Sequence, residues 1–84
     1  MHVQARFFAA HRERIGASSL DVELPDAATV GDLVERIAQR YPELRPLLGA
    51  SRFAINREYA PPTSRLQNGD EVAFVPPVAG GSRS

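Results

Sequence analysis

Residues 29–41 have the sequence TVGDLVERIAQRY, and they decide the fold because they form the longest amphipathic helix that the chain predicts. Thr29 and Asp32 make a capping box with aspartate in the acidic position, so each side chain satisfies a backbone N–H at the helix start. From Val30 to Tyr41 the helix would span about 18 Å before Pro42 ends it, which is enough to cover one face of a small sheet. Its apolar stripe consists of Val30, Leu33, Val34, Ile37, Ala38 and Tyr41.

Two predicted strands precede this helix. Residues 2–8 and residues 20–24 alternate between apolar and polar side chains, and their closeness in the sequence favours antiparallel pairing. Residues 9–15 lie between them and stop at Gly16, which predicts a short helix with a glycine cap. The residues of the first strand that should face inward are Val3, Ala5 and Phe7.

Further strands are predicted after the helix. Residues 52–56 form a third strand, and residues 56–58 form a tight reversal that follows it. The sequence Asn68-Gly69-Asp70 predicts a turn, since Asn-Gly tolerates positive φ, and it leads into a last strand at residues 71–75. Pro76-Pro77 ends the sheet there, because proline cannot donate a ladder hydrogen bond.

The order of these elements predicts an α+β domain with a mixed sheet of about five strands around one main helix. This arrangement is the ubiquitin-like β-grasp fold. We expect the domain to span residues 1–77 and a flexible tail to span residues 78–84, which have nothing to pack against. The tail carries Gly80 and Gly81.

The bulk composition narrows the classes of function. The chain has 84 residues, enough for one domain, and its ten basic residues balance its ten acidic ones, so a nucleic-acid partner is disfavoured. It contains no cysteine, which excludes disulfides and thiolate metal sites and favours a cytoplasmic location. No signal peptide is visible, and no stretch approaches the ~20 apolar residues of a membrane span, so no membrane partner is expected.

Conventional catalytic and metal-binding sites are not indicated. His2 and His11 are too far apart to form a helical metal pair, and we expect both on the surface or at sheet edges. Asp70 and Glu71 fit turn chemistry better than a catalytic carboxylate pair. The Gly80-Gly81 segment is the remaining candidate, because a backbone without side chains can enter a narrow channel on a partner.

The last predicted strand is apolar on both of its faces. Val72 and Phe74 share one face, and Ala73 and Val75 share the other. One face meets the helix, whereas the other is either a docking patch or ordinary core packing, two explanations that the sequence weighs evenly. Two further residues are expected near this second face, Phe8 and Ala54.

Four segments of the chain match a known family pattern: residues 6–16, 29–33, 54–59 and 66–81. The last is the most specific, with the runs NGDEVAF and PPVAGG. Together the segments resemble the small subunits of molybdopterin synthases, which are ubiquitin-like sulfur carriers. The resemblance covers residues 3–81, nearly the whole chain.

This resemblance implies a role for the tail. In the family, the terminal glycine is adenylated by a ubiquitin-activating-type enzyme that consumes ATP, and it then becomes a thiocarboxylate. By position, Gly81 would carry that chemistry and Gly80 would give clearance. The loaded tail enters the large synthase subunit, in an expected heterotetramer, where its sulfur builds the dithiolene of molybdopterin. The carrier itself binds no metal or cofactor and supplies no acid or base, so it is not catalytic alone. The expected partner-binding residues are Phe8, Ala54, Val75, Pro76, Pro77, Val78 and Ala79.

One departure from the family pattern leaves alternatives open. Ser82-Arg83-Ser84 follow Gly81, and an amide cannot be adenylated as a carboxylate can. The extension is a precursor end that is trimmed, a fragment or cloning end, or a mark of lost carrier activity. Two other functions also stay open. One is a sibling carrier for thiazole formation, tRNA thiolation or protein conjugation, and the other is a β-grasp binding module with an inert tail.

Overall fold

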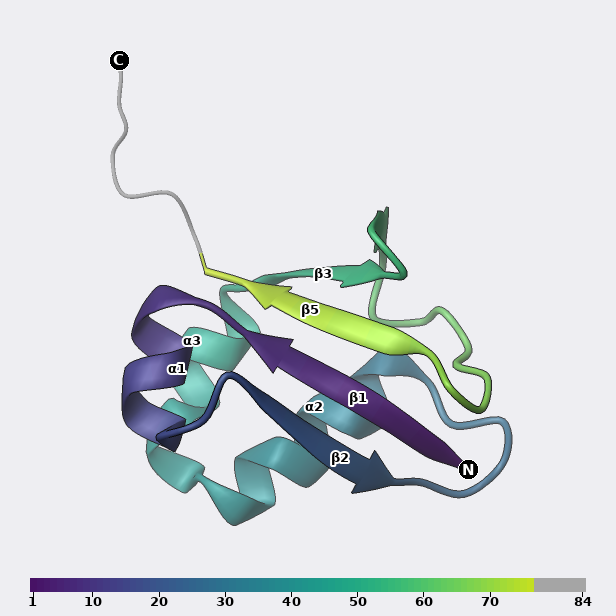
Figure 1. Ribbon diagram of the computed structural model, residues 1–84, viewed down its shortest axis with the longest axis horizontal. Helices are drawn as coiled ribbons and strands as arrows, with labels where there is room; N and C mark the ends of the chain where they lie inside the picture. The colour runs from purple at the N-terminus through teal and green to yellow at the C-terminus, as the bar shows by residue number, and fades with distance from the viewer. Residues whose placement is uncertain (77–84) are drawn as a thin grey trace.

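The computed structural model describes residues 1–76, without the side chains of Ala9 and Ala10. Its elements are β1 (His2–Phe7), α1 (Ala9–Ile15), β2 (Ser19–Glu23), α2 (Val30–Arg40), the 3₁₀ helix η1 (Pro42–Leu44), α3 (Arg45–Gly49), β3 (Arg52–Ile55), β4 (Glu58–Ala60) and β5 (Glu71–Val75). The five strands form one mixed sheet in the order β2-β1-β5-β3-β4 (Figure 1). This arrangement confirms the predicted β-grasp fold. The predicted boundary at residue 77 and the tail at residues 78–84 lie outside the described residues.

The last strand, β5, occupies the middle of the sheet between β1 and β3. It pairs parallel with β1 and antiparallel with β3, so Phe74 lies opposite both Phe7 and Phe53. The centroid of the Phe74 ring is 5.3 Å from that of Phe7 and 5.5 Å from that of Phe53. Aromatic rings attract one another at these separations, and all three are buried. The core therefore depends on β5, the last strand of the described residues.

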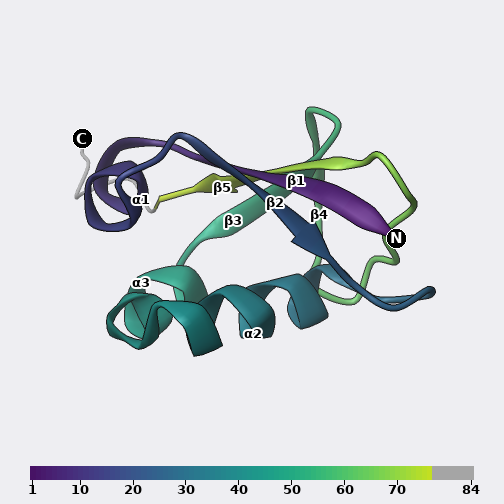
Figure 2. The same ribbon diagram turned by 60° about the horizontal axis from the view of Figure 1, so that its bottom comes forward.

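Helix α2 covers one face of the sheet, as predicted. Its capping box is present: the Asp32 backbone N–H donates to Thr29 Oγ1 at 3.2 Å, and the Thr29 N–H donates to Asp32 Oδ2 at 2.9 Å. Figure 2 shows α2 and α3 on the same side of the sheet, with no described helix on the opposite side. We call that opposite side the outer face. The fully or nearly fully buried residues of α2 are Val30, Leu33, Ile37 and Ala38.

The predicted turns are confirmed by the backbone dihedral angles. Gly16 caps α1 with φ of 81°, and Gly69 precedes β5 with φ of 89°. Asn56 and Arg57 form the reversal between β3 and β4, with φ of 49° and 76°. The side chain of Asn56 also joins this hairpin to β5, because its Oδ1 accepts from the Glu71 N–H at 3.0 Å.

The expectation that His11 lies on the surface is wrong. Its side chain is fully buried, with ring centroids 6.4 Å from Phe7 and 6.3 Å from Phe74. Its Nε2 lies 2.8 Å from Ser51 Oγ, and the Ser51 hydroxyl donates to the Leu47 carbonyl at 2.7 Å. Because that hydroxyl has only one proton, Nε2 is the donor toward Ser51. The histidine therefore links α1 to the segment that enters β3.

The environment of His11 favours the neutral imidazole. Burial lowers the pKa of His11 below its ordinary value of 6.5, and a backbone interaction with Phe8 opposes this only in part. Within residues 1–76, Nδ1 has no hydrogen-bond partner and no ion pair includes the ring. A proton on Nδ1 would thus place an uncompensated charge in the core.

We expect Thr29→Ala to lower the free energy of unfolding by about 1 kcal/mol, because it removes one half of the capping box. In a domain of this size, that loss corresponds to a fall in Tm of about 4–8 °C. Thr63→Ala, in an exposed loop, is the matched control. Urea and thermal unfolding check both variants, and equal losses would contradict a special role for Thr29.

We expect the wild-type domain to lose stability as the pH falls below about 6.5, the value for histidine in an unfolded chain. Below that pH the unfolded chain binds more protons than the folded one, because the folded pKa of His11 is lower. The loss is complete below the folded pKa, and its slope is at most about 1.4 kcal/mol per pH unit for one proton.

Urea unfolding at pH 7.5 and 5.5 measures this dependence. His11→Gln can still donate to Ser51 but does not titrate, so it should flatten the dependence between these two pH values. His2→Gln changes an exposed histidine and should retain the wild-type dependence. A His11→Gln variant as pH-sensitive as the wild type would disprove the assignment.

Candidate functional site

The outer face of the sheet aligns side chains from four strands in one row. Arg6 of β1 lies beside Ala73 of β5. Ala73 in turn lies beside Ala54 of β3, and Ala54 lies beside Tyr59 of β4. Side chains at paired positions point to the same side of a sheet. The row therefore has a floor of two alanines, with a large side chain at each end.

A second row lies nearer the end of β5. Val75 pairs with Arg52 of β3, and Phe8 follows the last residue of β1. Phe8 is 41% exposed and Tyr59 is 67% exposed, which marks them as the exposed large hydrophobic residues of the described part. Pro76 follows Val75 directly. We call the set Phe8, Ala54, Tyr59, Ala73 and Val75 the outer patch.

The predicted partner-binding residues that the structure describes gather at one end of the sheet. Val75 ends β5 and Pro76 follows it, Phe8 follows the residue of β1 that pairs with Phe74, and Ala54 pairs with Ala73. Ala54 is only 9% exposed, so it forms part of the floor and does not protrude. The remaining predicted site residues, Pro77, Val78, Ala79, Gly80 and Gly81, lie outside the described residues.

The two faces of the last strand differ in burial. Val72 and Phe74 are fully buried under the helices, as core packing requires. Ala73 and Val75 are half-buried and face the side that no described helix covers (Figure 2). Exposed apolar side chains that cluster in this way are typical of binding surfaces. The docking role of the outer patch stays a prediction.

Arginine side chains border the outer patch, although they were not among the predicted site residues. The Arg6 guanidinium lies 5.9 Å from the centroid of the Phe8 ring, and that of Arg52 lies 5.6 Å from the centroid of the Tyr59 ring. Arg6 also pairs with Glu71, whose Oε2 is 3.2 Å from Nη1. Strand alternation alone would have placed Arg6 beside Phe8, because residues two apart in a strand lie on the same face.

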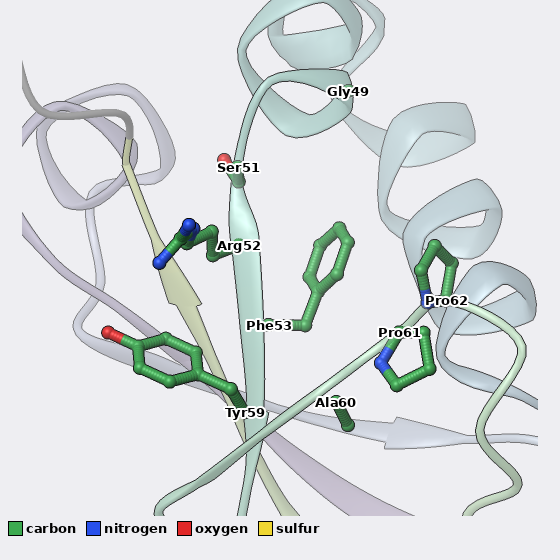
Figure 3. Close-up of a pocket in the computed structure, with 8 residues that line it drawn as sticks. All are labelled: Gly49, Ser51, Arg52, Phe53, Tyr59, Ala60, Pro61 and Pro62. Carbon is green, nitrogen blue, oxygen red and sulfur yellow. The ribbon is translucent and has the colours of Figure 1, made fainter.

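An open groove of about 520 Å³ adjoins the patch at the edge strand β4. Figure 3 shows Arg52 and Tyr59 on one side of β3 and the Phe53 ring on the other, toward Pro61 and Pro62. The groove lining contains no carboxylate, histidine or cysteine. It is therefore suited to apolar contact and not to acid–base chemistry.

The described residues do not form a catalytic centre. The pair His11–Ser51 is not an activated nucleophile, because the Ser51 proton goes to the Leu47 carbonyl and His11 has no carboxylate partner among residues 1–76. Within the same residues, no group of three or more potential metal ligands occurs. No helix of this part has the length and apolar character needed to cross a membrane. What these residues present instead is an exposed, partly apolar surface beside the end of β5.

Comparison with known proteins gives this surface a family context. The molybdopterin synthase sulfur carrier subunit of Mycobacterium tuberculosis is 40% identical over 80 residues, covering 94% of this chain and 96% of that protein. A putative molybdopterin converting factor subunit 1 from Pyrococcus furiosus superposes with a TM-score of 0.85 at 29% identity. The match covers 93% of this chain and 99% of the Pyrococcus chain. A third match is a chain in the complex of subunits 1 and 2 of the molybdopterin-converting factor from Helicobacter pylori. Its TM-score is 0.67 at 28% identity, and the match covers 96% of this chain and 100% of the Helicobacter chain.

A family model gives the same assignment. The model described as the ThiS family matches residues 5–81, which include the second half of β1, all of β2, β3, β4 and β5, and the Gly80-Gly81 segment. Because this match spans nearly the whole chain, the protein belongs to the ThiS family.

Proposed function

We propose that this chain is the sulfur carrier subunit of a molybdopterin synthase and that Gly81 carries the sulfur. One observation carries the proposal: the family match extends through Gly80 and Gly81, directly beyond a strand that ends beside an exposed apolar patch. The relative from Mycobacterium tuberculosis bears the name of this subunit. The absence of a catalytic centre among residues 1–76 is compatible with a carrier, whose partners supply the catalytic groups.

Activation in this proposal requires Gly81 to be the chain terminus, so the amide between Gly81 and Ser82 must first be hydrolysed. The freed carboxylate then attacks the α-phosphate of ATP in an adenylating enzyme of the ubiquitin-activating type, and pyrophosphate leaves. A sulfur nucleophile next attacks the acyl carbon, and AMP leaves with the C–O electron pair. The product is a thiocarboxylate on Gly81, and Gly80 leaves room for it in the enzyme's channel.

The receiving partner in this proposal is the large subunit of the synthase. The Helicobacter pylori complex that contains a similar chain joins subunits 1 and 2 of the molybdopterin-converting factor. We assign the outer patch to this contact, with the tail reaching the large subunit's active site, where the sulfur builds the dithiolene. Assembly into a heterotetramer with two large subunits, and a cytoplasmic location, belong to the same proposal.

The activation chemistry can be tested by varying the chain end. A chain that ends at Gly81 should gain AMP on incubation with the adenylating enzyme and ATP, and should form a thiocarboxylate when a sulfur donor is added. Mass spectrometry measures both products. The 84-residue chain should remain unmodified, because its Gly81 is an amide, and a chain that ends at Gly80 is a second control.

Two outcomes would point elsewhere. If the chain ending at Gly81 takes up neither AMP nor sulfur, the protein is a binding module with an inert tail. If it takes up sulfur but does not deliver it to cyclic pyranopterin monophosphate in the large subunit, it is a carrier for another sulfur pathway.

The docking surface can be tested at Val75. We expect Val75→Asp to weaken binding to the large subunit at least about tenfold, because the contact would bury an unpaired carboxylate. The fold should persist, since Val75 is only half-buried on the outer face. Isothermal titration calorimetry gives the Kd and circular dichroism checks the fold. Gln39→Asp, on an exposed position of α2, introduces the same charge on the other side of the molecule and should leave the Kd unchanged.

A further inference from the structure

Two arginine–aromatic stacks border the outer patch, one on each side of its alanine floor. Arg6 lies over Phe8 at the β1 side, and Arg52 lies over Tyr59 at the β4 side. Strand β5 alone separates the strands that carry the two arginines. With a spacing of about 4.8 Å between neighbouring strands, the backbones of β1 and β3 lie about 10 Å apart.

Each stack holds a guanidinium in place before any partner arrives. An arginine that rests on an aromatic face has fewer side-chain conformations to lose on binding, and its planar fork suits a carboxylate. Among residues 1–76, Arg52 takes part in no ion pair. Arg6 is paired with Glu71 through Nη1 but has further N–H donors, and its side chain is 44% exposed. Both guanidinium groups can therefore donate hydrogen bonds to a carboxylate of another protein.

The acidic residues of the outer face lie on its other half. Asp21 and Glu23 of β2 pair in register with Gln4 and His2 of β1, and Glu71 begins β5. Arg52 thus lies beside the end of β5, Asp21 and Glu23 lie on the far edge strand, and the Arg6–Glu71 pair lies between them. A partner placed the wrong way round would bring like charges together, which is costly at an interface.

We propose that the two stacks select the orientation and identity of the partner surface. Arg6 and Arg52 each bind a carboxylate of the large subunit, and an apolar side chain of that subunit packs between them on Ala54 and Ala73. This inference rests on the proposed function, because it takes the large subunit as the partner. The partner face should then carry two carboxylates separated by about 10 Å or more, with an apolar residue between them.

The test measures the Kd for the large subunit at low and high salt with the full chain. Arg52→Gln should weaken binding about tenfold at low salt, and Arg6→Gln combined with Arg52→Gln should weaken it further. Both changes should also reduce the dependence of the Kd on salt, because charged contacts are lost. Arg52→Lys should recover only part of the affinity, since an ammonium group cannot form the bidentate contact. Arg40→Gln, at the exposed end of α2 on the opposite face, is the matched control and should stay within twofold of wild type.

The outcomes separate this inference from the proposed function. A double variant that binds like the wild type, with the same salt dependence, would overturn the role of the stacks. If Val75→Asp weakens binding in the same titrations, the outer patch still docks the large subunit and only this inference fails. A wild-type chain that does not bind the large subunit would overturn both. Circular dichroism and Tm confirm that each variant is folded, and Arg52→Gln remains a test even if loss of the Arg6–Glu71 pair destabilises the double variant.

Discussion

The packing of α2 against one side of the sheet sets what the other side can do. Helix α2 has eleven residues, about 16 Å, while five strands spaced by about 4.8 Å span roughly 19 Å. With the short α3 beside it, this helix is enough to bury a single face (Figure 2). No second helical layer occurs in the described part, so the outer face must meet water or another protein. The face that the core does not use is therefore the one to which we assign partner binding.

The outer face meets that requirement with a mixed composition. Its middle consists of small alanines, and its margins carry aromatic rings whose faces are partly covered by guanidinium groups. The long stems of arginine cover apolar surface while their charged ends stay in water. Val75 belongs both to this surface and to the last strand, so the patch and the end of β5 are fixed to each other. A partner that docks on the patch would meet the chain's exit point at a set distance and angle.

Local features were predictable because their causes lie within a few residues. The capping box needs only Thr29 and Asp32, and the left-handed cap at Gly16 needs only the glycine that ends a short helix. The two faces of β5 likewise followed from alternation, which placed Val72 and Phe74 together on the face that the structure buries. Gly80 and Gly81 could be chosen as candidates without any structure, because their chemistry depends on the chain end.

Features that depend on register or on distant contacts were not predictable. His11 is buried because α1 sits against the end of the sheet, beside Phe74 and Ser51, which are far away in sequence. A seven-residue helix gives too little periodicity to show which residue faces inward. The stack of Arg52 on Tyr59 depends on the pairing of β3 with β4 and on side-chain conformations, and the row from Arg6 to Tyr59 depends on three pairings at once.

The parallel pairing of β1 with β5 has a consequence for biosynthesis. Strand β1 can pair with its central neighbour β5 only after residues 71–75 have emerged from the ribosome. Phe7 therefore contacts Phe74 only at that stage. Contacts between residues so distant in sequence slow folding, because the chain must close a long loop before they form. Until then, β1 and β3 have no strand between them and their apolar faces are exposed. The sheet therefore cannot be completed before residues 71–75 are available, and the Gly80-Gly81 segment follows those residues closely in the sequence.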